Sequence, residues 1–182
     1  MTHSTRNLFC ALALLMAFAA PRAQDAAPNT PNTAMTAVDY VNTAASSDEF
    51  ERQTGTLATQ RGQDDAVKAF GQHLVDDHTA TSENLIAAAT AAGVPAPTLR
   101  LHPGQQRMVD ELTKAPAAVF DQLFLKIQAA AHVDAVALHS TWAKVGEEPP
   151  LRDVASATVP IVTEHLHHVH RLQRQIGQVE SE

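Results

Sequence analysis

The sequence predicts an all-α fold: an antiparallel bundle of four long helices, with a short extra helix in the longest connection. Of the 182 residues, 45% are hydrophobic but only 4% are aromatic, and Ala, Val and Leu dominate the hydrophobic share. This composition suits closely packed helices better than strands. From about Met35 onward, apolar residues recur at spacings of three and four, which is the period of an α-helix. The length suits a single domain with one core.

The first 23 residues have the pattern of a secretory signal peptide. A polar segment with Arg6 precedes an apolar run from Leu8 to Ala20, and small residues follow around Ala23, after which we expect cleavage. The apolar run is shorter than the roughly 20 residues that a membrane-spanning helix needs. We therefore expect no transmembrane anchor after cleavage, and a location in the periplasm or at the outer membrane.

A linker and one domain are expected to follow the signal peptide. Residues 24–34 are rich in Pro, Asn, Thr and Ala and have no periodicity, so they cannot bury enough apolar surface to offset the entropy of ordering. We expect this segment to be disordered and residues 35–178 to form the bundle. The only cysteine, Cys10, lies in the signal peptide, so the exported domain has no disulfide to stabilise it.

The first long helix is predicted over residues 35–61 and the second over 63–92, with turn signals at Gly62 and in 93–97. Spacings of three and four give each helix one core-facing stripe. The first stripe is Val41, Ala44, Asp48, Glu51, Gly55 and Ala58, and the second is Val67, Phe70, Leu74, His78, Thr81, Leu85 and Ala88. Near its centre, the first stripe carries carboxylates and the second carries a histidine.

A short helix is predicted over 103–114, and two more long helices over 116–145 and 149–177. The stripe of the third long helix includes Leu125, Ala129, His132, Val136 and His139, and that of the fourth includes Val154, Thr158, Ile161, His165, Val169 and Leu172. Pro160 has no amide hydrogen, so we expect it to bend or interrupt the last helix. The long connection, residues 93–115, is expected to cross over the bundle, as in ferritin-like folds.

Four inward polar residues, one from each long helix, are the candidate site: Glu51, His78, His132 and His165. A bundle core can assemble a metal site from side chains on facing helices. Carboxylate and imidazole ligands suit transition metals such as iron, zinc or copper. A single inward histidine is more often a hydrogen-bonded core residue. The alternative is therefore a metal-free core in which the histidines bond to one another.

Four further residues are weaker candidates for metal binding. Asp77 and Glu164 directly precede two of the inward histidines and could support them through hydrogen bonds. His167 and His168 belong to a histidine-rich run in which residues three apart could chelate a metal at the surface. His73, with one of the two aspartates at 76 and 77, is a similar pair. A solvated helix face explains these surface residues equally well.

The same sequence argues against nucleic-acid binding and catalysis. Without the signal peptide, which contains two of the 13 basic residues, the chain has 11 basic residues against 20 acidic ones, so nucleic acid is not an expected partner. A di-iron centre needs Glu-x-x-His motifs on two helices, and only Glu164 with His167 supplies one. No nucleophile triad or phosphate-binding loop is present. We therefore do not expect an enzyme.

Several short motifs occur together between Asp39 and Gln175. They are Ala44-Ala45-x-Ser47-x3-Glu51-x3-Gly55-x-Leu57-Ala58, Val67-Lys68-x-Phe70, Val75-x-Asp77-His78-Thr79, Gly93-Val94-x-x-Pro97, Phe120-Asp121, His132-x3-Val136 and Thr158-x-Pro160-x4-His165-Leu166. Together they resemble a bacterial family known as domain of unknown function 4142 (DUF4142), whose members are exported and often described as outer membrane proteins. The resemblance implies a ferritin-like fold and an exported location, but no reaction.

Two departures from this family pattern concern the candidate site. The family has an acidic residue before the histidine of the third long helix, where this chain has Ala131. It also has Phe-Glu where this chain has His139-Ser140. The resemblance therefore implies a weaker or altered site. The function predicted is metal handling or stress tolerance in the cell envelope by a bundle that binds a transition metal. The alternative is a metal-free structural or protein-interaction module of the envelope.

Overall fold

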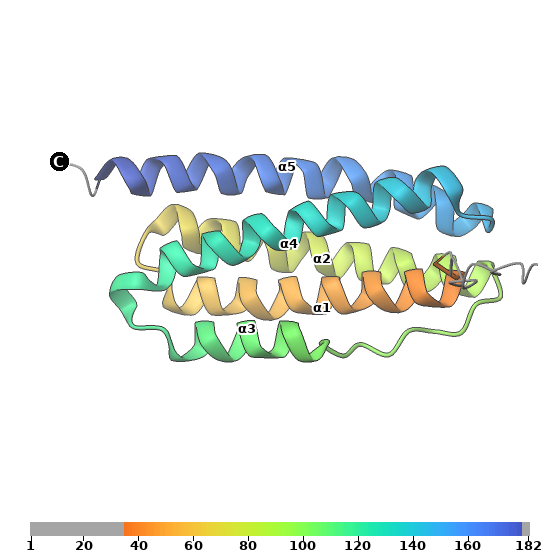
Figure 1. Cartoon of the computed structure of the whole chain (residues 1–182), viewed down its shortest axis with the longest axis horizontal. Coiled ribbons are helices and arrows are strands. Elements are labelled where there is room, and N and C mark those ends of the chain that lie inside the picture. The colour runs from red at the N-terminus through yellow and green to blue at the C-terminus, as the bar shows by residue number, and fades with distance from the viewer. Residues whose placement is uncertain (1–34, 180–182) are drawn as a thin grey trace, which may run out of the picture. The chain divides into compact units, whose positions relative to one another are not determined.

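The computed structural model describes residues 35–179, and the regular structure in this part of the chain is entirely helical (Figure 1). The helices are α1 (Ala37–Arg61), α2 (Asp65–Ala91), α3 (Pro103–Lys114), α4 (Ala117–Val145) and α5 (Pro149–Val179). The predicted all-α bundle, with four long helices and a short one in the crossover, is confirmed. The predicted signal peptide, residues 1–23, and the predicted linker, residues 24–34, lie outside the described residues.

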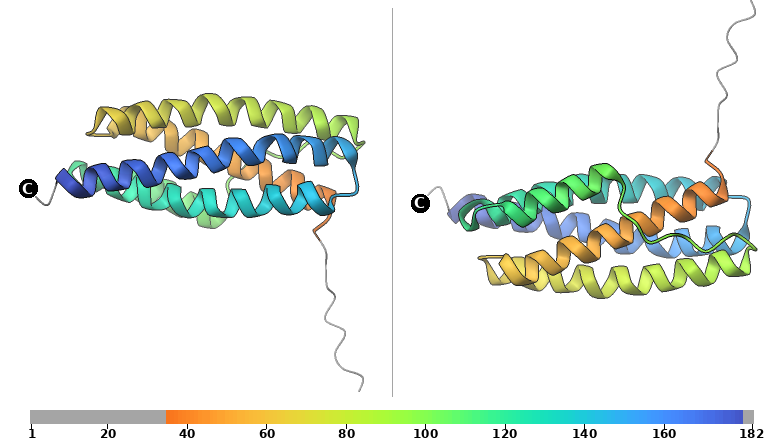
Figure 2. Two further views of the ribbon diagram at one scale, coloured as in Figure 1. Left: turned by 90° about the horizontal axis from the view of Figure 1, so that it is seen from above. Right: turned by 90° about the horizontal axis from the view of Figure 1, so that it is seen from below.

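The four long helices form two antiparallel hairpins, α1 with α2 and α4 with α5 (Figures 1 and 2). α2 packs against α5 and α1 packs against α4, so each long helix contacts two others. The crossover after α2 returns the chain along the bundle, and α3 packs across α1 and α4 (Figure 2). This arrangement, with a single long crossover, is that of a ferritin-like bundle.

Hydrogen bonds from side chains fix the beginnings of α1 and α2. Thr36 and Asp39 form a capping box, in which each side chain accepts the backbone N–H of the other at 3.1 Å. The turn into α2 is held by Asp121 of α4, whose carboxylate accepts the backbone N–H groups of Gln63 at 3.0 Å and Asp64 at 2.8 Å. The α1–α2 hairpin is therefore joined directly to the start of the second hairpin.

Of the two effects predicted for Pro160, a bend or an interruption of the helix, the interruption is wrong, because α5 is helical without a break from Pro149 to Val179. Pro160 lies on the exposed side of the helix, as does Ser156, whose carbonyl loses its usual partner. Water can bond to that carbonyl at little cost. Buried residues before and after the proline, such as Ala155 and Val162, hold the helix against the bundle.

α1 and α2 approach each other most closely at two glycines. A Cβ atom on Gly71 would lie 2.6 Å from the backbone oxygen of Gly55, and a Cβ atom on Gly55 would lie 2.6 Å from the oxygen of Gly71. Neither backbone can move aside without shifting its helix. The two glycines therefore set the spacing, and with it the register, of the first hairpin.

Gly71→Ala should lower the free energy of unfolding by about 2–3 kcal/mol, because the new methyl group forces the two helices apart. Gly177→Ala is the matched control in α5, since a Cβ there meets nothing within 4 Å. It should be neutral or stabilising by up to about 1 kcal/mol. Urea denaturation measures both. Equal stability of the two variants would mean that α1 and α2 do not approach this closely.

The core consists of two apolar clusters separated by buried polar residues. The Phe70 cluster contains Phe50, Ala58, Val67, Phe70, Leu74, Val109, Leu112, Ala115, Phe120, Phe124, Leu125, Ile127, Val169 and Leu172. The Tyr40 cluster contains Tyr40, Val41, Ala44, Ala45, Leu85, Ala89, Trp142, Leu151 and Ala155. Between them lies what we call the polar layer: Asp48, Glu51, Thr54, His78, Thr81, Gln128, His132, Thr158 and His165, each at most 4% exposed.

The order of residues along the helices explains this layering. In α2, His78 and Thr81 occur between Leu74 of the Phe70 cluster and Leu85 of the Tyr40 cluster. α5 runs in the opposite direction and has the reverse order, with His165 after Ala155 and before Val169. Polar residues at mid-helix therefore meet at mid-bundle, sealed from both ends by apolar packing. Such burial is costly unless each polar group has a partner.

Candidate metal centre

Three histidines from three helices meet in the polar layer. His78 of α2, His132 of α4 and His165 of α5 are 1%, 0% and 2% exposed. Their ring centroids are 5.2 to 5.8 Å apart. One ligand nitrogen from each ring lies within 4.8 Å of those of the other two. The structure thus brings three of the four predicted ligands together.

Each of the three rings is held on its outer side by an oxygen atom. His78 Nδ1 lies 2.8 Å from Asp48 Oδ1, His132 Nδ1 lies 3.0 Å from the carbonyl oxygen of Gln128, and His165 Nε2 lies 3.0 Å from Asp77 Oδ2. A carboxylate or carbonyl oxygen accepts, so the ring nitrogen donates in each bond. In a neutral ring the second nitrogen then keeps a free lone pair. Histidine ligands in metal sites are commonly held in this way.

Two neutral rings cannot supply a hydrogen atom for every contact around His132 and His165. His132 Nε2 lies 3.3 Å from His165 Nδ1, and the N–H groups of both neutral rings are already donated, to Gln128 and Asp77. Two neutral imidazoles supply two protons for three contacts. If His132 has its proton on Nδ1, its Nε2 lone pair faces that of His165 Nδ1. If the proton is on Nε2, the Nδ1 lone pair faces the carbonyl oxygen of Gln128 instead. A cation between the two nitrogens would remove this conflict.

Burial keeps these two rings neutral. It lowers the pKa of His132 to about 3 and that of His165 to about 4, and in both cases the positive charge on His78 lowers the pKa further. Asp77 opposes the shift at His165. At neutral pH both rings therefore have a lone pair available, which is the form that binds a metal.

His78 differs from the other two histidines because several carboxylates lie near its ring. Burial lowers its pKa, but the hydrogen bond from its ring to Asp48 and the negative charges of Glu51, Asp48 and Asp77 together outweigh burial and raise it. Its Nε2 atom is buried and has no hydrogen-bond partner among the described residues. This nitrogen is therefore a potential metal ligand that takes no part in the hydrogen-bond network.

Glu51 lies beside the three histidines but outside the group whose ligand atoms are mutually within 4.8 Å. Its Oε2 atom is also buried and unpartnered among the described residues. Burial raises the pKa of Glu51 to about 7, which His78 and Gln128 partly oppose and Asp48 reinforces. A buried oxygen without a partner costs about 1–3 kcal/mol, so the charged form of Glu51 destabilises the core, despite its hydrogen bond with Gln128, unless a proton or a cation binds to Oε2.

The weaker candidates are split between the site and the surface. Asp77, expected to support its neighbour His78, instead lies against His165. His73 also contacts Asp77 Oδ2, at 2.9 Å. Glu164 is exposed and pairs with Arg171. The other two weaker candidates, His167 and His168, are exposed and half-buried respectively.

Two residues of the network were not among the predicted ligands, although both are on α-helical stripes that face the core. Asp48 accepts both from His78 and from the Thr81 hydroxyl, which lies at 2.9 Å. Gln128 supplies the carbonyl oxygen for His132, and its side-chain amide donates to Thr54 at 2.8 Å. The signal for Asp48 was its position three residues before Glu51 on the same stripe. A backbone carbonyl such as that of Gln128 leaves no such signal.

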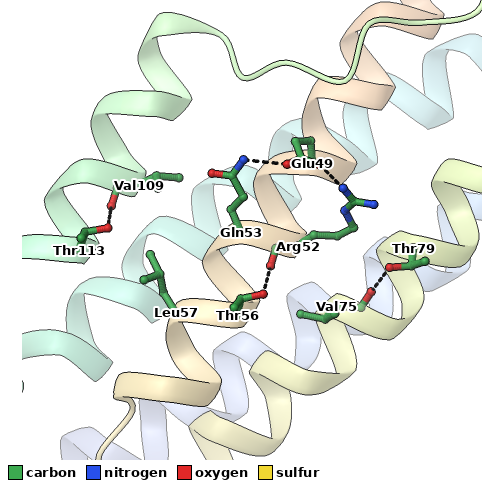
Figure 3. Close-up of a pocket in the computed structure, with 9 residues that line it drawn as sticks. All are labelled: Glu49, Arg52, Gln53, Thr56, Leu57, Val75, Thr79, Val109 and Thr113. Atoms are coloured by element: carbon green, nitrogen blue, oxygen red, sulfur yellow. Dashed lines mark hydrogen bonds and ion pairs between the residues drawn. The ribbon is translucent and has the colours of Figure 1, made fainter.

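The outer groove between α1, α2 and α3 is not part of this centre (Figure 3). Its polar side chains already pair with one another or with their own helix. Arg52 and Gln53 donate to Glu49, and three threonine hydroxyls donate to backbone carbonyls. No histidine lines the groove. We therefore place the chemistry of the molecule in the polar layer.

The chain was compared with family models, curated proteins and solved structures. A family model described as "Domain of unknown function (DUF4142)" matches residues 22–172. No curated protein and no solved structure matches the chain. Within residues 35–179, no helix combines the length and apolar character needed to cross a membrane.

Proposed function

The chain belongs to the DUF4142 family, and we propose that it is a metal-binding protein. One transition-metal ion would be bound in the polar layer by His78, His132 and His165, with Glu51 as the fourth ligand or as a neighbouring negative charge. We further propose that it acts in the cell envelope, in metal handling or stress tolerance. The N-terminal signal pattern supports that location.

The facing nitrogens of His132 and His165 are the observation that carries the proposal. Their separation is 3.3 Å. Two nitrogens bound to one tetrahedral ion at 2.0–2.1 Å are about 3.3–3.4 Å apart. The pair therefore has the spacing of two ligands of one ion, and it has no proton to share. The unpartnered Nε2 atom of His78 supports the assignment, since it is a third buried ring nitrogen without another partner, and an ion bound there would displace any proton on it.

The ligand set favours zinc, iron or copper. Imidazole nitrogens suit all three metals, and a carboxylate suits iron and zinc. Asp48, Asp77 and Glu51 place negative charge around the proposed ion, which offsets its positive charge in the buried layer. With Glu51 as the fourth ligand, the site would have no open position for a substrate. We therefore propose binding or storage of the ion and no catalysis at it.

A metal-free structural or interaction module is the second candidate, and one observation favours it. The outer hydrogen bonds of the three histidines, to Asp48, Gln128 and Asp77, form without an ion. Those to Asp48 and Asp77 already connect α2 to α1 and to α5, while the bond to Gln128 stays within α4 and fixes the ring of His132. In that case the histidines would favour one packing arrangement of the helices over others, a role that buried polar groups have in some proteins.

Elemental analysis distinguishes the two candidates, using protein purified from its native compartment without a polyhistidine tag. The metal-binding proposal predicts about one metal equivalent per chain. A chelator should then lower Tm by roughly 10 °C, since a ligand at 1,000 times its Kd stabilises by about 4 kcal/mol. Protein that contains no metal, and that melts identically with and without chelator, would support the structural module.

A further inference from the structure

The ring of His165 has contacts on both of its nitrogens. Nδ1 faces His132 in the polar layer, while Nε2 lies 3.0 Å from Asp77 Oδ2. The same oxygen lies 2.9 Å from His73 Nε2. The side chains of His73 and Asp77 are 51% and 37% exposed. His165 therefore separates the buried histidines from a pair of residues that are open to solvent.

His73, Asp77 and His165 are themselves a plausible ligand set. One ligand atom from each lies within 4.8 Å of the others, and the rings of His73 and His165 are 5.3 Å apart and nearly perpendicular. Two imidazoles and one carboxylate suit the same metals as the buried site. Phe70 covers another side of His165, with ring centroids 6.1 Å apart. His73 and Asp77 therefore lie between the ring of His165 and solvent on the side of Nε2.

We propose that His73, Asp77 and His165 Nε2 form a second metal site at the surface, which captures a divalent transition-metal ion and passes it to the buried site through the shared ring of His165. This inference rests on the proposed buried metal site and adds to it a route of uptake. Asp77 has a different role in each state: it binds the ion at the surface site and accepts a hydrogen bond from His165 when the buried site is filled.

The shared ring makes the two sites alternatives. A neutral imidazole has one lone pair and one N–H group. With the ion at the surface site, the Nε2 lone pair binds it and Nδ1–H donates to His132 Nε2. With the ion at the buried site, Nδ1 has released its proton to solvent and binds the ion, while Nε2 has taken a proton from water and donates to Asp77. One ion therefore excludes the other at His165, as transfer requires.

His73→Gln tests this route because it removes a surface ligand and leaves the three buried histidines in place. The measurement is stopped-flow uptake of Zn²⁺ by metal-free protein, and removal of Zn²⁺ by a chelator. Both rates should fall about tenfold or more, while the stoichiometry and the equilibrium Kd stay the same. A route that speeds entrance to a site must speed exit from it equally. Asp77→Asn should slow both steps and also weaken binding, because Asp77 orients His165.

His170→Gln is the matched control, since His170 is an exposed histidine of α5 outside both groups of ligands. It should leave both rates unchanged. If the wild-type protein takes up Zn²⁺ in the buried site and His73→Gln does so at the same rate, the uptake route is overturned while the buried site stands. If the wild-type protein takes up no metal of any kind, the proposed function itself fails. The route is supported if His73→Gln slows uptake at an unchanged Kd and His170→Gln does not.

Discussion

Replacing His132 with leucine is expected to lower the affinity for Zn²⁺ by at least about 100-fold, because residues that merely orient a ligand are already worth 10–100-fold. The three rings form a triangle, in which His132 lies 5.8 Å from His78 and 5.2 Å from His165 by centroids. Leucine fills much of the same space without a donor atom. Competition against a chromogenic chelator measures the loss of affinity.

The same substitution should not destabilise the metal-free protein. It removes one of the two acceptors that face each other at 3.3 Å, and replacing a conflicting buried polar group with an apolar one is often neutral or stabilising. Urea denaturation in chelator checks this expectation. A variant that binds less metal yet folds at least as well separates a metal ligand from a structural histidine.

His139→Leu is the matched control for this prediction. It is the same substitution, in the same helix, at a site that is 5% exposed. His139 Nδ1 is bonded to the Tyr40 hydroxyl at 3.0 Å, and His139 is outside the proposed ligand set. Its loss should cost about 1–3 kcal/mol of stability by leaving Tyr40 unpaired, with little change in Zn²⁺ affinity. Equal loss of affinity in the two variants would contradict the proposed site.

Glu51→Gln is expected to act in opposite directions on stability and on metal binding. Burial raises the pKa of Glu51 from its ordinary value of 4.5 to about 7, so the folded protein holds this proton to a higher pH than the unfolded chain does. The free energy of unfolding therefore falls as pH rises from about 4.5 to about 7, and the loss persists above that range. Glutamine removes this penalty and should stabilise the metal-free protein at pH 8 by about 1–3 kcal/mol.

In the presence of Zn²⁺ the order should reverse. The ion offsets the negative charge of Glu51, so the wild-type carboxylate then stabilises the loaded protein and its removal weakens binding. Urea denaturation at pH 5 and pH 8, with chelator and with Zn²⁺, gives all four comparisons. At pH 5 without metal, the two proteins should be nearly equally stable. A metal-free Glu51→Gln variant less stable than wild type at pH 8 would mean that the hydrogen bond with Gln128 and the charge of His78 outweigh the cost of burying the carboxylate.

The helices could be predicted from the sequence because helical periodicity is a local property. Spacings of three and four placed His78, His132 and His165 on core-facing stripes, and the structure buries all three. The interruption predicted at Pro160 does not occur because the cost of a proline depends on its surroundings. On the exposed side of α5 the freed carbonyl faces water, and packing on both sides of the proline keeps the helix continuous.

Distances between helices could not be predicted in the same way. Glu51 lies on the expected stripe, but the axial register of α1 against α2 depends on the contact between Gly55 and Gly71, which no single stripe reveals. Asp77 precedes His78 in sequence and contacts His165 on another helix for the same reason. The proton shortage between His132 and His165 arises only when both rings are placed in three dimensions.

Anomalous diffraction at the absorption edge of the bound metal is the most direct test of the central claim. Crystals of the metal-loaded protein should give one strong anomalous peak in the polar layer, about 2.0–2.1 Å from His78 Nε2, His132 Nε2 and His165 Nδ1. A loaded protein whose peak lies only among the surface histidines of α5, with none in the polar layer, would contradict it.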